Sequence, residues 1–302
     1  MRWDGGEEGG DVEDRRGLSP LHIGGGIGAG GVILALIGYF VFGIDPRQIL
    51  AADPAAGPAA EQQQAATGAP TDPQGRFANV VFTSTERVWA SQFKAQGKTW
   101  ENPKLVLYDQ ATITGCGIGQ EAMGPFYCPR DGKVYLDLAF FRELSQRFGA
   151  PGDFARAYVI AHEVGHHVQN LLGVSDKAAQ AEQAAGSRAG ANRVSVAVEL
   201  QADCYAGVWA KAYQQTGRLD PGDIPVALKA ASSVGDDTLQ RQTRGVVVPD
   251  SFTHGSAAQR THWFAQGYQS GDPASCNTFK AMSGAEPGSD SGADPAPTPD
   301  PQ

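Results

Sequence analysis

The chain has 302 residues, a formal net charge of −9 and a sequence pI of about 5.1. An acidic chain of this kind lacks the basic face with which nucleic-acid-binding proteins contact phosphates, so we expect no nucleic-acid partner. The length allows one large domain or two small ones. A domain of roughly 200 residues buries about 70 % of its unfolded surface, which is enough for a stable core.

The N-terminal part of the chain predicts a membrane anchor. Residues 1–20 are polar and rich in glycine and acidic side chains, and we expect a disordered tail. Residues 21–45 follow, with an uncharged apolar run of 22 residues at 23–44; a membrane-spanning helix needs about 20. A cleaved signal peptide is the alternative, although its apolar region usually has about 7–15 residues. Most nearby basic residues precede the run, so we expect a single-pass protein with a cytoplasmic N-terminus and an extracytoplasmic domain in the cell membrane.

Composition also divides the rest of the chain. Residues 46–76 are rich in Ala, Pro, Gln and Gly and have no core-forming pattern, so we interpret them as a linker. The C-terminal residues 283–302 have the composition of a disordered acidic tail. The single folded domain is therefore expected at 77–282.

The expected elements of this domain place strands early and helices late. Asp131-Gly132 is a strong turn dipeptide between two β-rich runs and predicts a hairpin. Asp153 is expected to be the N-cap of the helix at 153–172. Periodicity predicts strands at 104–108 and within 125–138, and helices at about 77–97, 139–149, 153–172, 192–216, 223–235 and 256–269. This order is typical of an α+β fold.

The helix expected at 153–172 contains the sequence HEVGH. Four residues advance about 400° around a helix, so the rings of His162 and His166 leave one face and can bind one metal ion. Glu163 lies about 100° away and can take a proton from a zinc-bound water, whose pKa the metal lowers to about 7. The apolar flanks argue against a solvated histidine pair. We predict a single zinc ion here, with Glu163 as the base and His167 as a neighbouring or packing residue.

A catalytic zinc site has three protein ligands and one water, so a third ligand must lie elsewhere. Glu199 and Asp203 are four residues apart in an apolar stretch of the helix expected at 192–216. We predict that Glu199 is the third ligand and that Asp203 accepts the outer N–H of a ligand histidine, which fixes its tautomer. The alternative is a solvated pair of acids. Two histidines and a glutamate also bind other metals of zinc's series.

The even number of cysteines predicts disulfide bonds, because the domain is expected outside the cytoplasm. Four cysteines allow three pairings. We predict Cys116–Cys128, which flank a short loop leading into the hairpin, and Cys204–Cys276, which tie the second long helix to the C-terminal segment.

Several segments together resemble the bacterial putative neutral zinc metallopeptidase family. They are MRWDGGEEGGDVEDRRG, the single apolar run, GPFYCPRDGKVYLD, AHEVGHHVQN, ELQADCYAGVWA and FTHGSAAQRTHWFAQG. HExxH with a later ExxxD is the pattern of glutamate-zincins, and the resemblance covers nearly the whole chain except the linker and the acidic tail. It implies a zincin-like fold, with a small sheet packed on the HExxH helix, zinc between that helix and the glutamate helix, and a mostly helical C-terminal part.

The last of these segments is similar to the HP…R segment of membrane-associated glutamate-zincins, with Gly255 in place of the proline. The resemblance implies that His254 stabilises the oxyanion formed during hydrolysis and that Arg260 braces the acids of the site. The alternative is a helix N-terminus with a surface histidine and an exposed arginine.

Two functions fit these features. The first is a membrane-anchored zinc peptidase that hydrolyses a peptide or protein substrate in the cell envelope, with the extended substrate pairing with a strand in 125–138. The second is a non-catalytic, zinc-stabilised binding or scaffold protein of the envelope. A structural zinc site usually has four protein ligands, and the sequence offers no evident fourth one. We therefore favour the enzyme.

Overall fold

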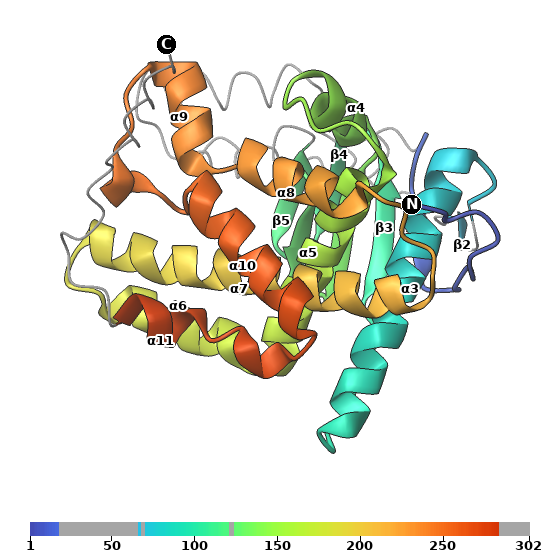
Figure 1. Ribbon diagram of the computed structural model, residues 1–302, viewed down its shortest axis with the longest axis horizontal. Coiled ribbons are helices and arrows are strands. Elements are labelled where there is room, and N and C mark those ends of the chain that lie inside the picture. The colour runs from blue at the N-terminus through green and yellow to red at the C-terminus, as the bar shows by residue number, and fades with distance from the viewer. Residues whose placement is uncertain (18–65, 68–69, 121–123, 284–302) are drawn as a thin grey trace, which may run out of the picture.

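The computed structural model describes residues 1–17, 66–67, 70–120 and 124–283 (Figure 1). The predicted membrane span, most of the predicted linker and nearly all of the predicted acidic tail lie outside these residues. Within the described part of the chain, no helix is both long enough and apolar enough to cross a bilayer.

The main sheet has five strands in the order β2-β1-β3-β7-β6. β3 runs parallel to its neighbours β1 and β7, whereas the outer strands β2 and β6 are antiparallel to theirs. A separate hairpin, β4–β5, was not predicted. The strands are β1 (Val12–Asp14), β2 (Ala66–Thr67), β3 (Lys104–Tyr108), β4 (Ala111–Thr114), β5 (Gly117–Gln120), β6 (Phe126–Cys128) and β7 (Lys133–Asp137).

Helices make up most of the C-terminal part, so the fold is α+β as predicted. In Figure 1 helices α6–α11 gather on one side of the molecule and α3 lies on the other, beside the sheet. The helices α6, α9 and α11 were not predicted. The helices are α3 (Pro73–Ala95), α4 (Ala139–Gln146), α5 (Asp153–Leu171), α6 (Val174–Ala184), α7 (Arg188–Gln215), α8 (Asp223–Ser233), α9 (Asp236–Arg244), α10 (Ala257–Ser270) and α11 (Thr278–Ser283), with short 3₁₀ turns η3 (Pro249–Ser251) and η4 (Pro273–Ser275).

Helix α7 forms the centre of the helical part and touches α10 backbone to backbone. A Cβ atom on Gly267 would lie 1.9 Å from the carbonyl oxygen of Cys204, and one on Gly207 would lie 2.1 Å from that of Phe264. Only glycine fits these two positions, since any side chain would push the helices apart. This crossing fixes α10 against the helix that carries the glutamate.

The N-terminal residues 1–17 are ordered, so the prediction of a disordered tail is wrong for them. β1 pairs with β3, and the side chain of Val12 is only 2 % exposed. The predicted linker also ends earlier than expected, because β2 and the first turn of α3 belong to the fold. Asp72 caps α3 by accepting a hydrogen bond from the backbone of Gly75. The polar composition of residues 1–17 did not indicate an ordered segment, because backbone pairing with β3 holds these residues rather than many apolar side chains.

Both predicted disulfides are present, and together they use all four cysteines. Cys116–Cys128 joins the turn of the β4–β5 hairpin to strand β6. Cys204–Cys276 joins the middle of α7 to the segment before α11. The prediction that Asp153 caps α5 is wrong. Gly152 holds the N-cap position, Asp153 is the first residue of the helix, and no side chain caps this end.

Candidate functional site

The two histidines of HEVGH lie on α5 and face a glutamate on α7. Nε2 of His162 lies 3.2 Å from Oε2 of Glu199, and Nε2 of His166 lies 3.5 Å from Oε1 of the same carboxylate. The helices approach closely because Gly165 faces Ala202, where a Cβ atom on the glycine would lie only 3.1 Å from the backbone. The structure thus brings together the three side chains predicted as metal ligands.

This group fits a zinc ion. One ligand atom from each of the three side chains can be chosen so that all lie within 4.8 Å of one another. Two imidazoles and one carboxylate are a known ligand set of catalytic zinc, in which a water takes the fourth position. The side chain of His166 is 17 % exposed and that of Glu199 18 % exposed, so the group is open to the adjoining cleft.

The outer ring nitrogens of both histidines have acceptors of their own. Nδ1 of His162 lies 2.9 Å from Oδ1 of Asp203, as predicted, and Nδ1 of His166 lies 2.9 Å from Oε1 of Gln169. The amide of Gln169 donates to the carbonyl of Val198 at 2.7 Å, which turns its oxygen towards the histidine. Such contacts fix the tautomer that leaves Nε2 free for a metal. Sequence reasoning missed Gln169, although a polar residue three positions after His166 on an apolar helix was a usable signal.

Asp203 is held from a second side by Arg260. The guanidinium Nε donates to Oδ2 at 2.8 Å and Nη2 donates to Oδ1 at 3.0 Å, and both side chains are buried. The hydroxyl of Tyr158 also donates to this carboxylate. Burial by itself would raise the pKa of Asp203, but Arg260 and His162 outweigh it and hold the pKa below its usual value. Arg260 therefore braces Asp203 and makes no hydrogen bond to Glu199.

The carboxylates create a negative field that favours a cation at the histidines. Burial lowers the pKa of His162, but Asp203 and Glu199 raise it more, to about 10. Burial by itself would raise the pKa of Glu199, but His166 and His162 outweigh it and hold this pKa below its ordinary value. A site that stabilises positive charge so strongly is suited to a metal ion.

Glu163 differs from the other two acids because burial dominates. Its side chain lines the cleft but is only 7 % exposed. Burial raises its pKa above the ordinary value, and the two histidines only partly oppose this. A carboxyl group with a raised pKa holds a proton more readily than an ordinary one, which suits a group that accepts a proton and returns it.

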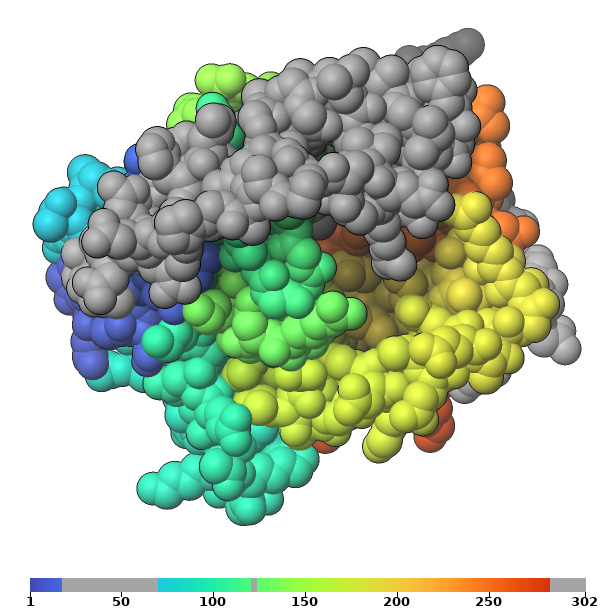
Figure 2. Space-filling view, turned by 180° about the vertical axis from the view of Figure 1, so that it is seen from behind, coloured from blue at the N-terminus to red at the C-terminus, as the bar shows by residue number. Residues whose placement is uncertain are grey.

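The cleft beside this group has a volume of about 300 Å³. Figure 2, which views the molecule from behind, shows a hollow between green residues of the strands and yellow residues of the long helices. Strand β6 lies along the cleft and is the last strand of the sheet. The cleft lining combines the polar residues above with apolar ones, Pro125, Phe126, Phe140, Val159 and Val234.

His254 also lines this cleft, on the loop before α10. Three successive backbone N–H groups of this loop, those of Thr253, His254 and Gly255, donate to Oδ2 of Asp236 at 2.7, 2.7 and 3.0 Å. Nδ1 of His254 lies 3.4 Å from Oδ1 of the same carboxylate. The hydrogen bond to Asp236 raises the pKa of His254, and Glu199 adds to the effect. Sequence reasoning missed Asp236, because no spacing rule connects it to a loop 18 residues away.

His167 contributes to packing. Its Nε2 lies 2.7 Å from the carbonyl of Glu101, and its Nδ1 lies 3.0 Å from the hydroxyl of Tyr127 on β6. The ring also contacts Trp100 edge-on. His167 therefore holds the edge strand in place above α5.

Comparisons with known proteins identify the family that the chain resembles. A family model described as "putative neutral zinc metallopeptidase" matches residues 1–279. The chain is 50 % identical to an uncharacterized protein of Escherichia coli, YpfJ, over 92 % of this chain and 99 % of that protein. It is 42 % identical to an uncharacterized protein of Mycobacterium bovis, Mb2605, over 80 % of this chain and 85 % of that protein. No solved structure matches the chain.

Proposed function

The chain belongs to the putative neutral zinc metallopeptidase family, and from this premise we propose that it is a zinc-dependent peptidase of the glutamate-zincin type. The observation that carries the proposal is the group of His162, His166 and Glu199 with Glu163 beside it, at the wall of one cleft. We propose that the first three bind one zinc ion and that Glu163 is the catalytic base.

The chemistry divides between the metal and the chain. When bound, zinc supplies a coordinated water with a pKa of about 7 and polarises the substrate carbonyl. Glu163 accepts the proton of the attacking water and returns it to the departing amine. His254 donates a hydrogen bond to the oxygen on which negative charge develops. Asp203 and Arg260 touch no substrate in this scheme, and they keep the ring of His162 in position.

Strand β6 supports a peptide as the substrate. Among the described strands it pairs only with β7, and we propose that an extended peptide pairs with its other edge. Backbone hydrogen bonds to such an edge hold a peptide without regard to its side chains. Phe126 and Phe140 add apolar surface in the same cleft.

We further propose that the enzyme acts in the cell envelope, anchored to the membrane through residues 21–45. Two disulfides support an oxidising compartment, because cytosolic reductants keep most thiols reduced. The 22-residue uncharged run supports the anchor. Its substrate would then be a peptide or protein of the envelope.

The decisive experiment compares the full-length wild type with Glu163→Gln in a peptide-library digest, with zinc content measured in parallel. We expect the variant to keep its zinc and to lose several orders of magnitude in turnover. Glu143→Gln serves as the matched control, since Glu143 is an exposed glutamate on α4. Equal hydrolysis by wild type and Glu163→Gln would rule out the mechanism. Absence of hydrolysis by a zinc-loaded wild type would favour the scaffold function.

A further inference from the structure

The ordered N-terminal segment, residues 1–17, and the start of the remaining domain meet at one edge of the main sheet. β1 and β2 are antiparallel partners, with Glu13 opposite Thr67 and Asp14 opposite Ala66. The chain between them contains the whole apolar run. It therefore leaves the sheet and returns to it at the same place.

The first residues of the segment are bound to the helical part of the domain. The backbone N–H of Arg2 donates to the carbonyl of Arg218 at 2.8 Å. Nε1 of Trp3 donates to Asp153, the first residue of α5, at 3.1 Å, and its ring packs edge-on against Phe77. These contacts reach the helix that carries the two histidines.

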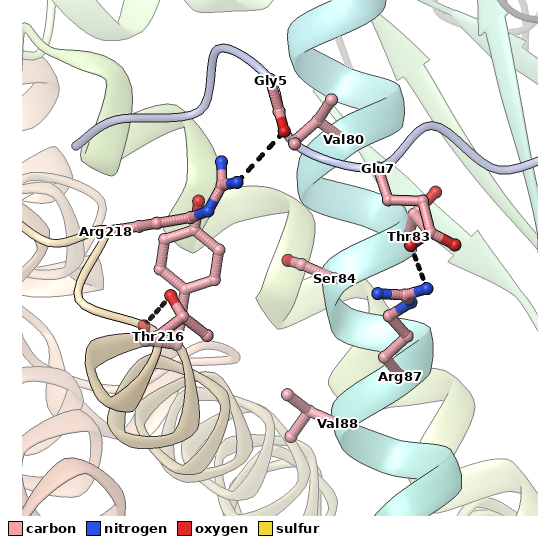
Figure 3. A pocket seen from close by; sticks show the side chains of 11 residues that line it. Gly5, Glu7, Val80, Thr83, Ser84, Arg87, Val88, Thr216 and Arg218 are labelled. Carbon is pink, nitrogen blue, oxygen red and sulfur yellow. Dashed lines mark hydrogen bonds and ion pairs between the residues drawn. The ribbon is translucent and has the colours of Figure 1, made fainter.

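The segment continues across a cleft of about 370 Å³ between α3 and the end of α7 (Figure 3). Arg218 donates to the carbonyl of Gly5 at 3.1 Å, and Glu7 forms an ion pair with Arg87 of α3 (Figure 3). Both contacts bind the N-terminal segment to residues that lie after the apolar run in the sequence.

Farther along, the backbone of the segment lies directly on α3. Gly9 donates to the side chains of Asn79 and Thr83 at 3.0 and 2.9 Å, and its carbonyl accepts from Asn79 at 3.2 Å. A Cβ atom on Gly6 would lie 2.3 Å from the side chain of Val80, so the approach is as close as glycine allows. The segment is thus an integral layer of the fold.

The arginines that precede the apolar run are occupied within the domain. Arg16 pairs with Asp14 and with Asp72, the cap of α3, the latter at 2.6 Å. Arg15 pairs with Glu13 at 2.7 Å and donates to Thr112 at 3.2 Å. The prediction of a cytoplasmic N-terminus rests on these charges, but each arginine has a partner in the domain, Asp72 for Arg16 and Thr112 for Arg15.

We propose that residues 1–17 and the domain at 66–283 lie on the same side of the membrane. A single crossing by the apolar run would put them on opposite sides and separate β1 from β3. A return crossing by residues 45–65 is excluded, because this stretch contains four charged residues and three prolines. Charged side chains are rare and costly inside a membrane-spanning segment. The two disulfides of the domain put this shared side outside the cytoplasm.

The first test uses two single-cysteine probes in the full chain, Gly10→Cys on the segment and Gly186→Cys on the domain. Both glycines are exposed, and a Cβ atom at either position meets nothing within 4 Å. Cells are treated with a membrane-impermeant maleimide before or after permeabilisation. We expect the ratio of labelling before and after permeabilisation to be equal for the two probes. Labelling of one probe that depends on permeabilisation, while the other is labelled freely, would overturn the proposal.

The second test traps the contact itself. A Cβ atom on Gly9 would lie 3.6 Å from Cβ of Thr83, within the range of about 3.5–4.5 Å found in disulfides. The variant Gly9→Cys/Thr83→Cys is oxidised in membranes with a permeant oxidant, and its disulfides are mapped by mass spectrometry. We expect nearly complete cross-linking between these positions and little in Gly10→Cys/Thr83→Cys, the matched control. Two free thiols in the first variant would show that the segment is not docked in the membrane-bound protein. Neither test depends on peptidase activity.

Discussion

Nδ1 of His162 lies 2.9 Å from Oδ1 of Asp203, and the other oxygen of that carboxylate lies 2.8 Å from Nε of Arg260. The contact links α5 to α10 through a residue of α7. Because the bonded ring nitrogen is the outer one, the orientation of a proposed metal ligand depends on a side chain that follows it by about a hundred residues.

The first prediction concerns this link. Asp203→Asn removes the charged acceptor, so Nδ1–H of His162 is held less firmly, and we expect zinc affinity to fall by about 10–100-fold. The measurement is competition against a zinc chelator of known affinity. Because the change also leaves the buried Arg260 without its carboxylate partner, a thermal melt with and without zinc is recorded in parallel. Unchanged zinc affinity in a folded variant would contradict the role of Asp203.

The second prediction concerns the third ligand. Glu199→Ala leaves only two protein ligands, so we expect much less than one zinc per chain after dialysis against nanomolar free zinc. Glu163→Ala is the matched control, because it removes a carboxylate from the same cleft but not a proposed ligand. Elemental analysis of both variants gives the answer. Full zinc occupancy in Glu199→Ala would mean that the ligand has been assigned wrongly.

The third prediction concerns His254. Its imidazole lines the cleft, and we expect His254→Ala to lower kcat by about 10²–10³-fold with little change in KM, the usual effect of losing an oxyanion donor. Zinc content should stay the same. Asp236→Asn should also lower kcat, though less, since it loosens the loop and keeps the imidazole. Wild-type kinetics in His254→Ala would show that His254 is not an oxyanion donor and that its loop only forms the N-terminus of α10.

The fourth prediction concerns pH and a residue far from the cleft. Glu86 on α3 is 6 % exposed, and its Oε1 has no hydrogen-bond partner among the described residues. Burial, with a smaller contribution from Asp11, raises the pKa of Glu86 to about 8. Below the unfolded pKa of about 4.5 the carboxyl is neutral in both states. As pH rises from there to 8 the unfolded state loses its proton first, so stability falls.

Glu86→Gln removes this titration. We expect the variant and wild type to have similar Tm values at pH 4.5, and the variant to gain a few degrees over wild type by pH 8. Thermal melts across this range test the prediction. A difference in Tm that does not change with pH would show that Glu86 keeps its ordinary pKa in the folded protein.

Much of the candidate site could be predicted because its residues obey helical spacing. His162 with His166, and Glu199 with Asp203, are each four residues apart on apolar helices, so the sequence predicts that each pair shares one face of its helix. Asp236 could not be found this way. It acts by accepting three backbone hydrogen bonds from a distant loop, and such an arrangement exists only after the chain has folded.

The fold was predictable where local signals were strong. Strand β3 was predicted with its observed bounds, and the hairpin around Asp131-Gly132 was predicted as well. The prediction for residues 1–17 was wrong because their composition is that of a disordered segment. What orders them is a parallel pairing with residues 104–108 and glycine contacts with α3, and neither leaves a periodic pattern in the segment itself.

The parallel pairing of β1 with β3 also sets an order of events during synthesis. About ninety residues separate the two strands, so at roughly 5–20 residues per second the first strand waits about 5–20 seconds for its partner. The apolar run leaves the ribosome within that interval, while residues 1–17 have not yet docked onto the rest of the fold. Closure of the sheet and the proposed membrane attachment would therefore compete in time. A synthesis rate that changes with codon usage between residues 45 and 104 would alter the yield of correctly assembled protein without altering a single residue.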